Sequence, residues 1–120
     1  MPNRAHGAPR LSGGLRIGFA PGSLTRAIYG CDSIDEEYSC NYEVNSEYRV
    51  TLENSDMRVA GTGPEGEIRV IELPSHRFYV ATLYQPQRSS RPGAPNPLVA
   101  AFVGAARAFH EERAARGAWP

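Results

Sequence analysis

The chain has 120 residues, enough for one domain with a single hydrophobic core. It carries 13 basic and 13 acidic residues, so its formal net charge is zero, and 41% of its residues are hydrophobic. This balanced, scattered charge argues against a nucleic-acid-binding surface, and no stretch approaches the roughly 18 apolar residues of a membrane span. All the basic residues are arginine, and alanine and glycine are abundant, as is typical of a GC-rich bacterial genome.

The cysteines and histidines indicate the compartment and the absence of a metal. Cys31 and Cys40 are too few for a disulfide framework, and no secretory apolar segment precedes them. We therefore expect a reduced, cytoplasmic protein. His6, His76 and His110 are dispersed along the chain, so we expect no metal site and no cofactor.

The beginning of the chain predicts a flexible leader, then a strand and a short helix. Residues 1–14 are rich in glycine, proline and arginine without periodicity, so the folded domain is expected over 15–120. Residues 15–19 alternate as a strand does. Ser23 is the expected N-cap of the helix that follows, and Gly30 its left-handed end.

An acidic segment and a second strand and helix come next. Residues 32–37 are expected to form a solvated loop rather than a metal site, because no histidine or cysteine at ligand spacing accompanies them. Residues 38–44 alternate between apolar and polar types, which predicts a strand with one buried face. Asn45 is the expected cap of a helix over 46–54.

A hairpin and a buried strand are predicted in the middle of the chain. Residues 57–61 and 67–73 flank a Gly/Pro turn at 62–66, the pattern of an antiparallel hairpin. Residues 78–87 run from apolar strand formers into a polar cluster and a proline. This pattern is typical of a buried central strand that delivers residues to a site at its carboxyl end.

The last element is a helix that starts at Asn96-Pro97, with asparagine as cap and proline at the first helical position. One apolar stripe, expected to cover a face of the sheet, comprises Leu98, Phe102, Ala105 and Phe109. The predicted fold class is therefore an α/β domain with a mixed β-sheet of about five or six strands, a hairpin and flanking helices.

Six segments in this order carry a family resemblance. They are Leu15-Arg16-Ile17-Gly18, Tyr42-Glu43-Val44-Asn45, Met57-Arg58-Val59-Ala60-Gly61, Ile71-Glu72-Leu73-Pro74-Ser75-His76, Phe78-Tyr79-Val80-Ala81-Thr82, and Asn96-Pro97-Leu98 with Phe102-Val103. Together they resemble the closing half of the class I glutamine amidotransferase domain of CTP synthases. Cys40-Asn41-Tyr42 and residues 82–86 are still more similar to the CTP synthase C-terminal-region-related proteins. The resemblance implies a truncated, flavodoxin-like half-domain.

The resemblance also implies that the Cys-His-Glu triad is missing. In the parent family the nucleophilic cysteine belongs to the opening half of the domain, and the histidine and glutamate correspond to Gln85 and Gln87. A glutamine side chain can neither take a proton from a thiol nor orient an imidazolium as a carboxylate does. The arginine-rich segment that helps to hold glutamine corresponds to 38–41. We therefore expect that the chain does not hydrolyse glutamine.

The function that we expect first is a repurposed biosynthetic enzyme, such as a lyase, isomerase or cyclase, that acts on a small polar metabolite in the old pocket. Its candidate catalytic residues are Glu43 as acid or base, Tyr84 as hydrogen donor, Gln85 and Cys40, and its candidate substrate-binding residues are Tyr38, Asn41, Gln87 and Arg88. Simpler interpretations stand beside two of these. Cys40 also fits a buried apolar thiol, and Glu43 a hydrogen-bond acceptor that stabilises the fold.

The other open function is a noncatalytic binding or accessory subunit. A half-domain leaves a sheet edge and core surface uncovered, and bare strand edges pair readily with other strands. Under both interpretations we expect a homodimer or a partner chain that covers the truncated sheet.

Overall fold

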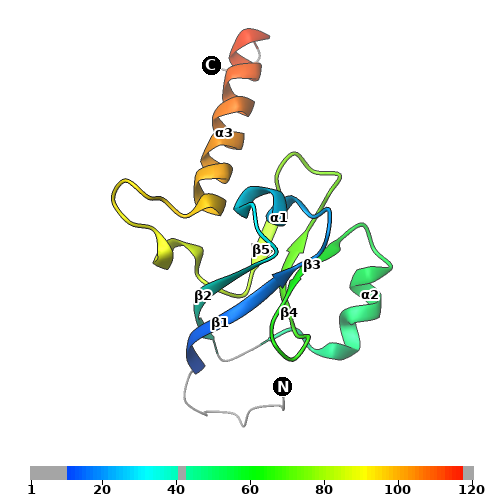
Figure 1. The fold of residues 1–120 in the computed structure, drawn as a ribbon. Coiled ribbons are helices and arrows are strands. Elements are labelled where there is room, and N and C mark those ends of the chain that lie inside the picture. The colour runs from blue at the N-terminus through cyan, green and yellow to red at the C-terminus, as the bar shows by residue number, and fades with distance from the viewer. Residues whose placement is uncertain (1–10, 41–42, 118–120) are drawn as a thin grey trace.

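A five-stranded sheet is the centre of the structure (Figure 1). The computed structural model describes residues 11–40 and 43–117. The strands lie in the order β2-β1-β3-β4-β5 and are β1 (Leu11–Phe19), β2 (Ser33–Cys40), β3 (Arg58–Thr62), β4 (Ile68–Glu72) and β5 (Val80–Thr82). Every pairing between these described strands is antiparallel. The predicted α/β class, with a hairpin and flanking helices, is confirmed.

Strands β1 and β2 form a long ribbon that corrects three sequence-based expectations. β1 begins at Leu11, inside the segment expected to be a leader. β2 includes most of the acidic segment expected to be a solvated loop, and it ends at Cys40, before the expected strand end at residue 44. The register pairs Arg16 with Asp35, whose side chains lie 2.9 Å apart. Cross-strand partners of this kind let an acidic segment form a strand.

Helix α1 (Leu24–Tyr29) has the caps that were predicted. The amide of Arg26 donates to Ser23 Oγ at 3.1 Å, and Gly30 ends the helix with a φ of 73°. A glycine reaches this left-handed conformation without the steric cost of a Cβ. The chain therefore turns after α1 and continues into β2.

The helix predicted after Asn45 is present in two parts. These are the 3₁₀ turn η1 (Ser46–Tyr48) and helix α2 (Arg49–Glu53). Asn45 Oδ1 accepts a hydrogen bond from the amide of Glu47 at 3.0 Å, as its predicted role requires.

The predicted hairpin is the β3–β4 pair. It contains a close approach at Gly61, where an added Cβ would lie 2.8 Å from Val70 and 3.1 Å from Ile17. The strand register also shifts on both sides of this residue. Any larger residue at position 61 would displace the core side chains beneath it.

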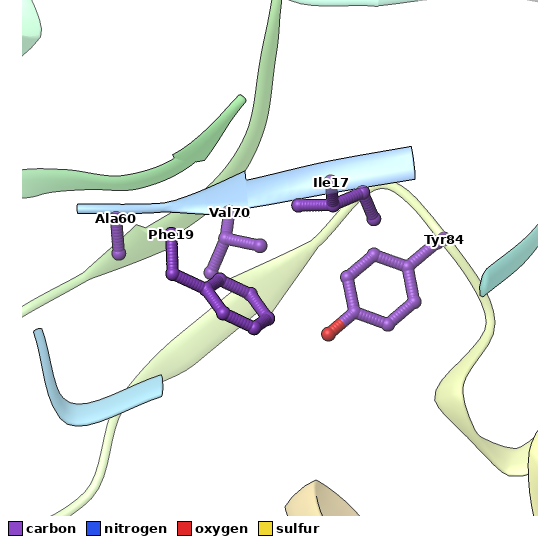
Figure 2. Packing of buried hydrophobic residues seen from close by; sticks show 5 residues of the cluster. All are labelled: Ile17, Phe19, Ala60, Val70 and Tyr84. Atoms are coloured by element: carbon purple, nitrogen blue, oxygen red, sulfur yellow. The ribbon is translucent and has the colours of Figure 1, made fainter. Parts of the chain in front are cut away.

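The hydrophobic core forms where the sheet meets the segment after β5 (Figure 2). Its buried members are Ile17, Phe19, Ala60, Val70 and Tyr84. The ring of Phe19 stacks on Tyr29 of α1, with the ring centroids 5.2 Å apart. This contact holds α1 against the sheet.

Strand β5 corrects the expectation of a buried central strand. It has only three residues, all half-buried, and it lies at the edge of the described sheet. The 3₁₀ turn η2 (Pro86–Ser89) follows it closely. An apolar run indicates burial, but it does not tell which neighbours provide that burial.

Helix α3 (Pro97–Ala115) begins as predicted but does not lie along the sheet. Asn96 Oδ1 accepts hydrogen bonds from the amides of Leu98 and Val99. Beyond its first turn the helix extends away from the sheet (Figure 1), and Phe102 is 57% exposed. The expectation that the apolar stripe covers a face of the sheet is therefore wrong: Leu98 is buried, but Phe102 and Phe109 are exposed. Periodicity identifies an apolar face but not the surface that buries it.

No helix within 11–40 and 43–117 is both long and apolar enough to cross a membrane.

Candidate functional site

The candidate site is the segment where β5 ends and η2 begins, and two backbone hydrogen bonds hold it. The amide of Leu83 donates to the carbonyl of Arg69 at 2.8 Å, and the amide of Gln85 donates to the carbonyl of Glu37 at 2.9 Å. The first bond continues the pairing with β4, and the second fixes the segment to β2. Strands that are distant in sequence therefore meet at Gln85.

Glu43 lies beside a buried arginine of β4. Arg69 is 3% exposed, and its Nη2 lies 3.7 Å from the Glu43 carboxylate. Its Nε lies 3.9 Å from Glu67, and its Nη1 donates to the carbonyl of Leu83 at 3.4 Å. A buried guanidinium needs nearby carboxylates and hydrogen-bond acceptors to offset its lost hydration. Glu43 therefore stabilises Arg69, and the contact brings Glu43 next to the segment that leads to Gln85.

Arg69 was missed in the sequence because an arginine within an apolar strand normally points outward to solvent. The available signal was its position in the run Ile68-Arg69-Val70, where both neighbours are core-type residues. Only the fold shows that acceptors from three segments surround it.

Tyr84 lies in the hydrophobic core. It is 3% exposed, and Figure 2 shows its ring beside Ile17. Its hydroxyl lies 3.0 Å from the hydroxyl of Tyr29. Burial raises the pKa of both phenols above their usual range, and the effect is large for Tyr84. Tyr84 therefore remains protonated at neutral pH and supports the segment from beneath.

The remaining predicted site residues lie at or near the surface of the turn. Gln85 is half-buried at the start of η2, and Gln87 and Arg88 are exposed on it. Asn41, together with the side chains of Tyr38 and Cys40, lies outside the part of the chain that is described. The structure thus links Glu43 through Arg69 to Leu83, which precedes the segment 84–88. The chemical roles assigned to these residues remain predictions.

A second polar cluster lies beneath the same turn and was not found from the sequence. Glu36 of β2 is 5% exposed, and its Oε1 accepts hydrogen bonds from Asn96 Nδ2 at 3.0 Å and Ser89 Oγ at 3.3 Å. Tyr29 donates to the same oxygen at 3.5 Å. Burial raises the pKa of the Glu36 carboxyl. Glu36 was not predicted to be buried, because a run of neighbouring carboxylates indicates a solvated segment.

A groove of about 610 Å³ lies elsewhere, between the end of β1, α2 and β3. Phe19, Arg49, Met57 and Arg58 are among the residues that line it, and none of the predicted site residues does. Within the described residues, no group of three or more histidine, cysteine, aspartate or glutamate side chains is arranged to hold a metal ion.

The sheet, its hairpin and the strand–turn–helix at the candidate site define a glutamine amidotransferase-like domain. The solved structure described as the Trypanosoma brucei CTPS glutaminase domain with bound acivicin matches with a TM-score of 0.80 and 26% sequence identity. The match covers 88% of this chain and 43% of that chain.

The sequence relatives give the particular family. CTP synthase of Nocardioides sp. is 40% identical over 108 residues, which cover 83% of this chain and 19% of that protein. CTP synthase of Chloroflexus aggregans is 37% identical over 100 residues, covering 78% of this chain and 18% of that protein. No protein-family model matches the chain. The chain is therefore related to CTP synthase and corresponds to the closing part of its glutamine amidotransferase domain.

The chain spans about a fifth of the length of the curated relatives that it matches.

Proposed function

We propose that this chain is a degenerate glutamine amidotransferase-like protein without glutaminase activity that serves as a noncatalytic binding or accessory domain. The observation that carries the proposal is that the two residues predicted to act as acid, base or hydrogen donor both have structural contacts. Glu43 is engaged with buried Arg69, and Tyr84 is a protonated core residue. Where the resemblance places histidine and glutamate, the chain has Gln85 and Gln87. An amide side chain supplies no general base at neutral pH.

A repurposed small-molecule enzyme, acting as a lyase, isomerase or cyclase, is the second candidate. It is favoured by Glu36, whose raised pKa and position beneath the turn are features found at functional sites. Its substrate would be a small polar metabolite held by the exposed Gln87 and Arg88. We place either function in a reducing cytoplasm, because Cys31 is an exposed free thiol.

Ammonia release from glutamine tests the central part of the proposal. We expect no release above the uncatalysed background from the full chain. Turnover that disappears in Cys40→Ser would overturn the proposal, because it would show a working thiol nucleophile.

Thermal shifts with a panel of small polar metabolites separate the two candidates. A ligand at the turn is expected to raise the unfolding temperature of the wild type and to lose this effect in Gln87→Ala and Arg88→Ala. Arg107→Ala, on the exposed face of α3, is the matched control and should retain the shift. A metabolite that stabilises the chain and is also consumed would favour the enzyme, whereas binding without turnover favours the binding domain.

A further inference from the structure

The turn that carries the candidate site rests on a buried carboxyl group. Glu36 Oε1 contacts Ser89 of η2, and it also contacts Asn96, the cap of α3. Asn96 Nδ2 in turn lies 2.7 Å from Ser89 Oγ. One carboxyl oxygen therefore joins β2, the end of the turn and the start of the last helix.

The other oxygen of the same carboxyl group is in a different environment. Glu36 Oε2 is buried and has no hydrogen-bond partner among the described residues. A neutral carboxylic acid tolerates this position better than a carboxylate does, because burying an unsatisfied charge costs far more than burying a neutral polar group.

The groups around Glu36 stabilise a negative charge only in part: hydrogen bonds from Ser89, Asn96 and Tyr29 lower the pKa of its carboxyl, but burial raises that pKa by more. Tyr29 of α1 donates one long hydrogen bond, and the hydroxyl of Tyr84 in turn contacts that of Tyr29. Glu37, the next residue of β2, adds a repulsive charge. The α3 side supplies the neutral Asn96.

We propose that Glu36 is a pH-sensitive positioning residue that holds the Gln85–Ser89 turn against β2 when it is protonated and loosens the turn when it ionises. The inference rests on the proposed function in one respect, since it is this turn that carries the candidate binding residues. Glu36 acts on the turn through its hydrogen bonds with Ser89 and Asn96.

The direction of the pH dependence follows from burial. The pKa of Glu36 is higher in the folded chain than in the unfolded chain, where it is about 4.3. The contribution of Glu36 to stability is therefore complete below the pKa of the unfolded chain and is lost as pH rises through the pKa of the folded chain. The turn should therefore be held firmly in acid and less firmly at alkaline pH.

The test compares the wild type with Glu36→Gln, Glu36→Ala and, as an exposed control, Glu47→Gln. Glutamine imitates the neutral acid in size and keeps one oxygen acceptor. The two readouts are the thermal midpoint and the exchange rate of the Gln85 amide, corrected for intrinsic exchange, from about pH 4 to pH 8.

We expect Glu36→Gln to match the wild type near the acid limit and to unfold a few degrees higher at the alkaline limit. Gln85 amide exchange should accelerate with pH in the wild type and in Glu47→Gln, but not in Glu36→Gln. Glu36→Ala should exchange rapidly at every pH. Identical pH profiles for wild type and Glu36→Gln would overturn the proposal, as would a Glu36→Gln variant that exchanges as rapidly as Glu36→Ala at every pH. Neither readout uses glutamine or a metabolite, so failure of the proposal for Glu36 is distinct from failure of the proposed function.

Discussion

At the residue scale, buried polar side chains connect the elements of this small domain. Glu72 at the end of β4 is 2% exposed, and it accepts the amides of Leu24 at 3.1 Å and Thr25 at 2.7 Å. The hydroxyl of Thr25 donates to the same carboxylate. Glu72 therefore attaches the start of α1 to the sheet and satisfies amides that the first helical turn leaves unpaired.

Replacing Glu72 should destabilise the fold strongly. We expect Glu72→Ala to lower the free energy of unfolding by about 2–4 kcal/mol, because it leaves two amides and a hydroxyl unsatisfied in a buried place. Urea unfolding monitored by circular dichroism measures this loss. Glu111→Gln, on the exposed part of α3, is the control and should change stability by less than about 0.5 kcal/mol. Equal stability of the two variants would show that α1 docks without Glu72.

Tyr84 gives a second prediction at the same scale. Tyr84→Phe removes the 3.0 Å hydroxyl contact with Tyr29 and should cost about 0.5–1.5 kcal/mol. The pKa of Tyr84 in the folded chain lies above its pKa in the unfolded chain, which is about 10. The contribution of the Tyr84 hydroxyl to stability is therefore present below about pH 10 and is lost as pH rises through the pKa of the folded chain. The phenolate absorbance that develops near pH 10–11 should therefore have equal amplitude in wild type and variant while both remain folded. A smaller amplitude in Tyr84→Phe would show that Tyr84 ionises in the native protein.

At the scale of elements, the loop between β4 and β5 holds helix α3. Arg77 donates to Glu112 at 3.1 Å, and its guanidinium lies 5.2 Å from the ring centroid of Phe109. Phe78 meets Phe102 edge-to-face, with centroids 5.7 Å apart. These contacts are on the surface and are open to water, so they position the helix more than they stabilise the fold.

Loss of Arg77 should loosen the far half of α3. Arg77 holds the pKa of Glu112 below its usual range. The stability that the Arg77–Glu112 contact contributes is therefore present above the pKa of Glu112 in the unfolded chain, about 4.3, and is lost as pH falls through its pKa in the folded chain. Arg77→Ala should therefore increase amide exchange around Glu112 at neutral pH, and the difference from wild type should shrink in acid. Arg107→Ala removes an ion pair with Glu111 within the helix and is the control, which should leave amide exchange around Glu112 close to that of the wild type. An unchanged exchange pattern in Arg77→Ala would show that the aromatic contact is sufficient.

At the scale of the whole molecule, two exposed apolar side chains of α3 favour the expectation of a partner. Phe102 and Val103 are 57% and 58% exposed on a helix that extends from the domain (Figure 1). We propose that a second copy of this chain covers these side chains, since exposed apolar surface of this kind marks interaction sites.

Association can be measured by light scattering coupled to size exclusion. The wild type should show a mass that increases with concentration, and Val103→Asp should remain monomeric, because a charge in an apolar contact is costly. Glu111→Gln again serves as control and should associate as the wild type does. A wild type that stays monomeric at every concentration would contradict pairing between copies of this chain.

Local features of the fold were predictable from short segments. The caps Ser23, Asn45 and Asn96 and the left-handed Gly30 were all confirmed, because each acts on amides or carbonyls within a few residues of itself. The hairpin around 62–66 was confirmed for the same reason. The family relationship also followed from short motifs taken in order.

The sequence by itself thus determined the kind of element at most positions, the fold class and the relationship to CTP synthase. Tertiary structure decided the pairing of the acidic segment as β2, the edge position of β5 and the direction of α3. It also decided that Arg69 and Glu36 are buried beside the turn that carries Gln85. The physical reason is that burial and charge pairing depend on residues distant in the chain, whereas caps and turns depend on immediate neighbours.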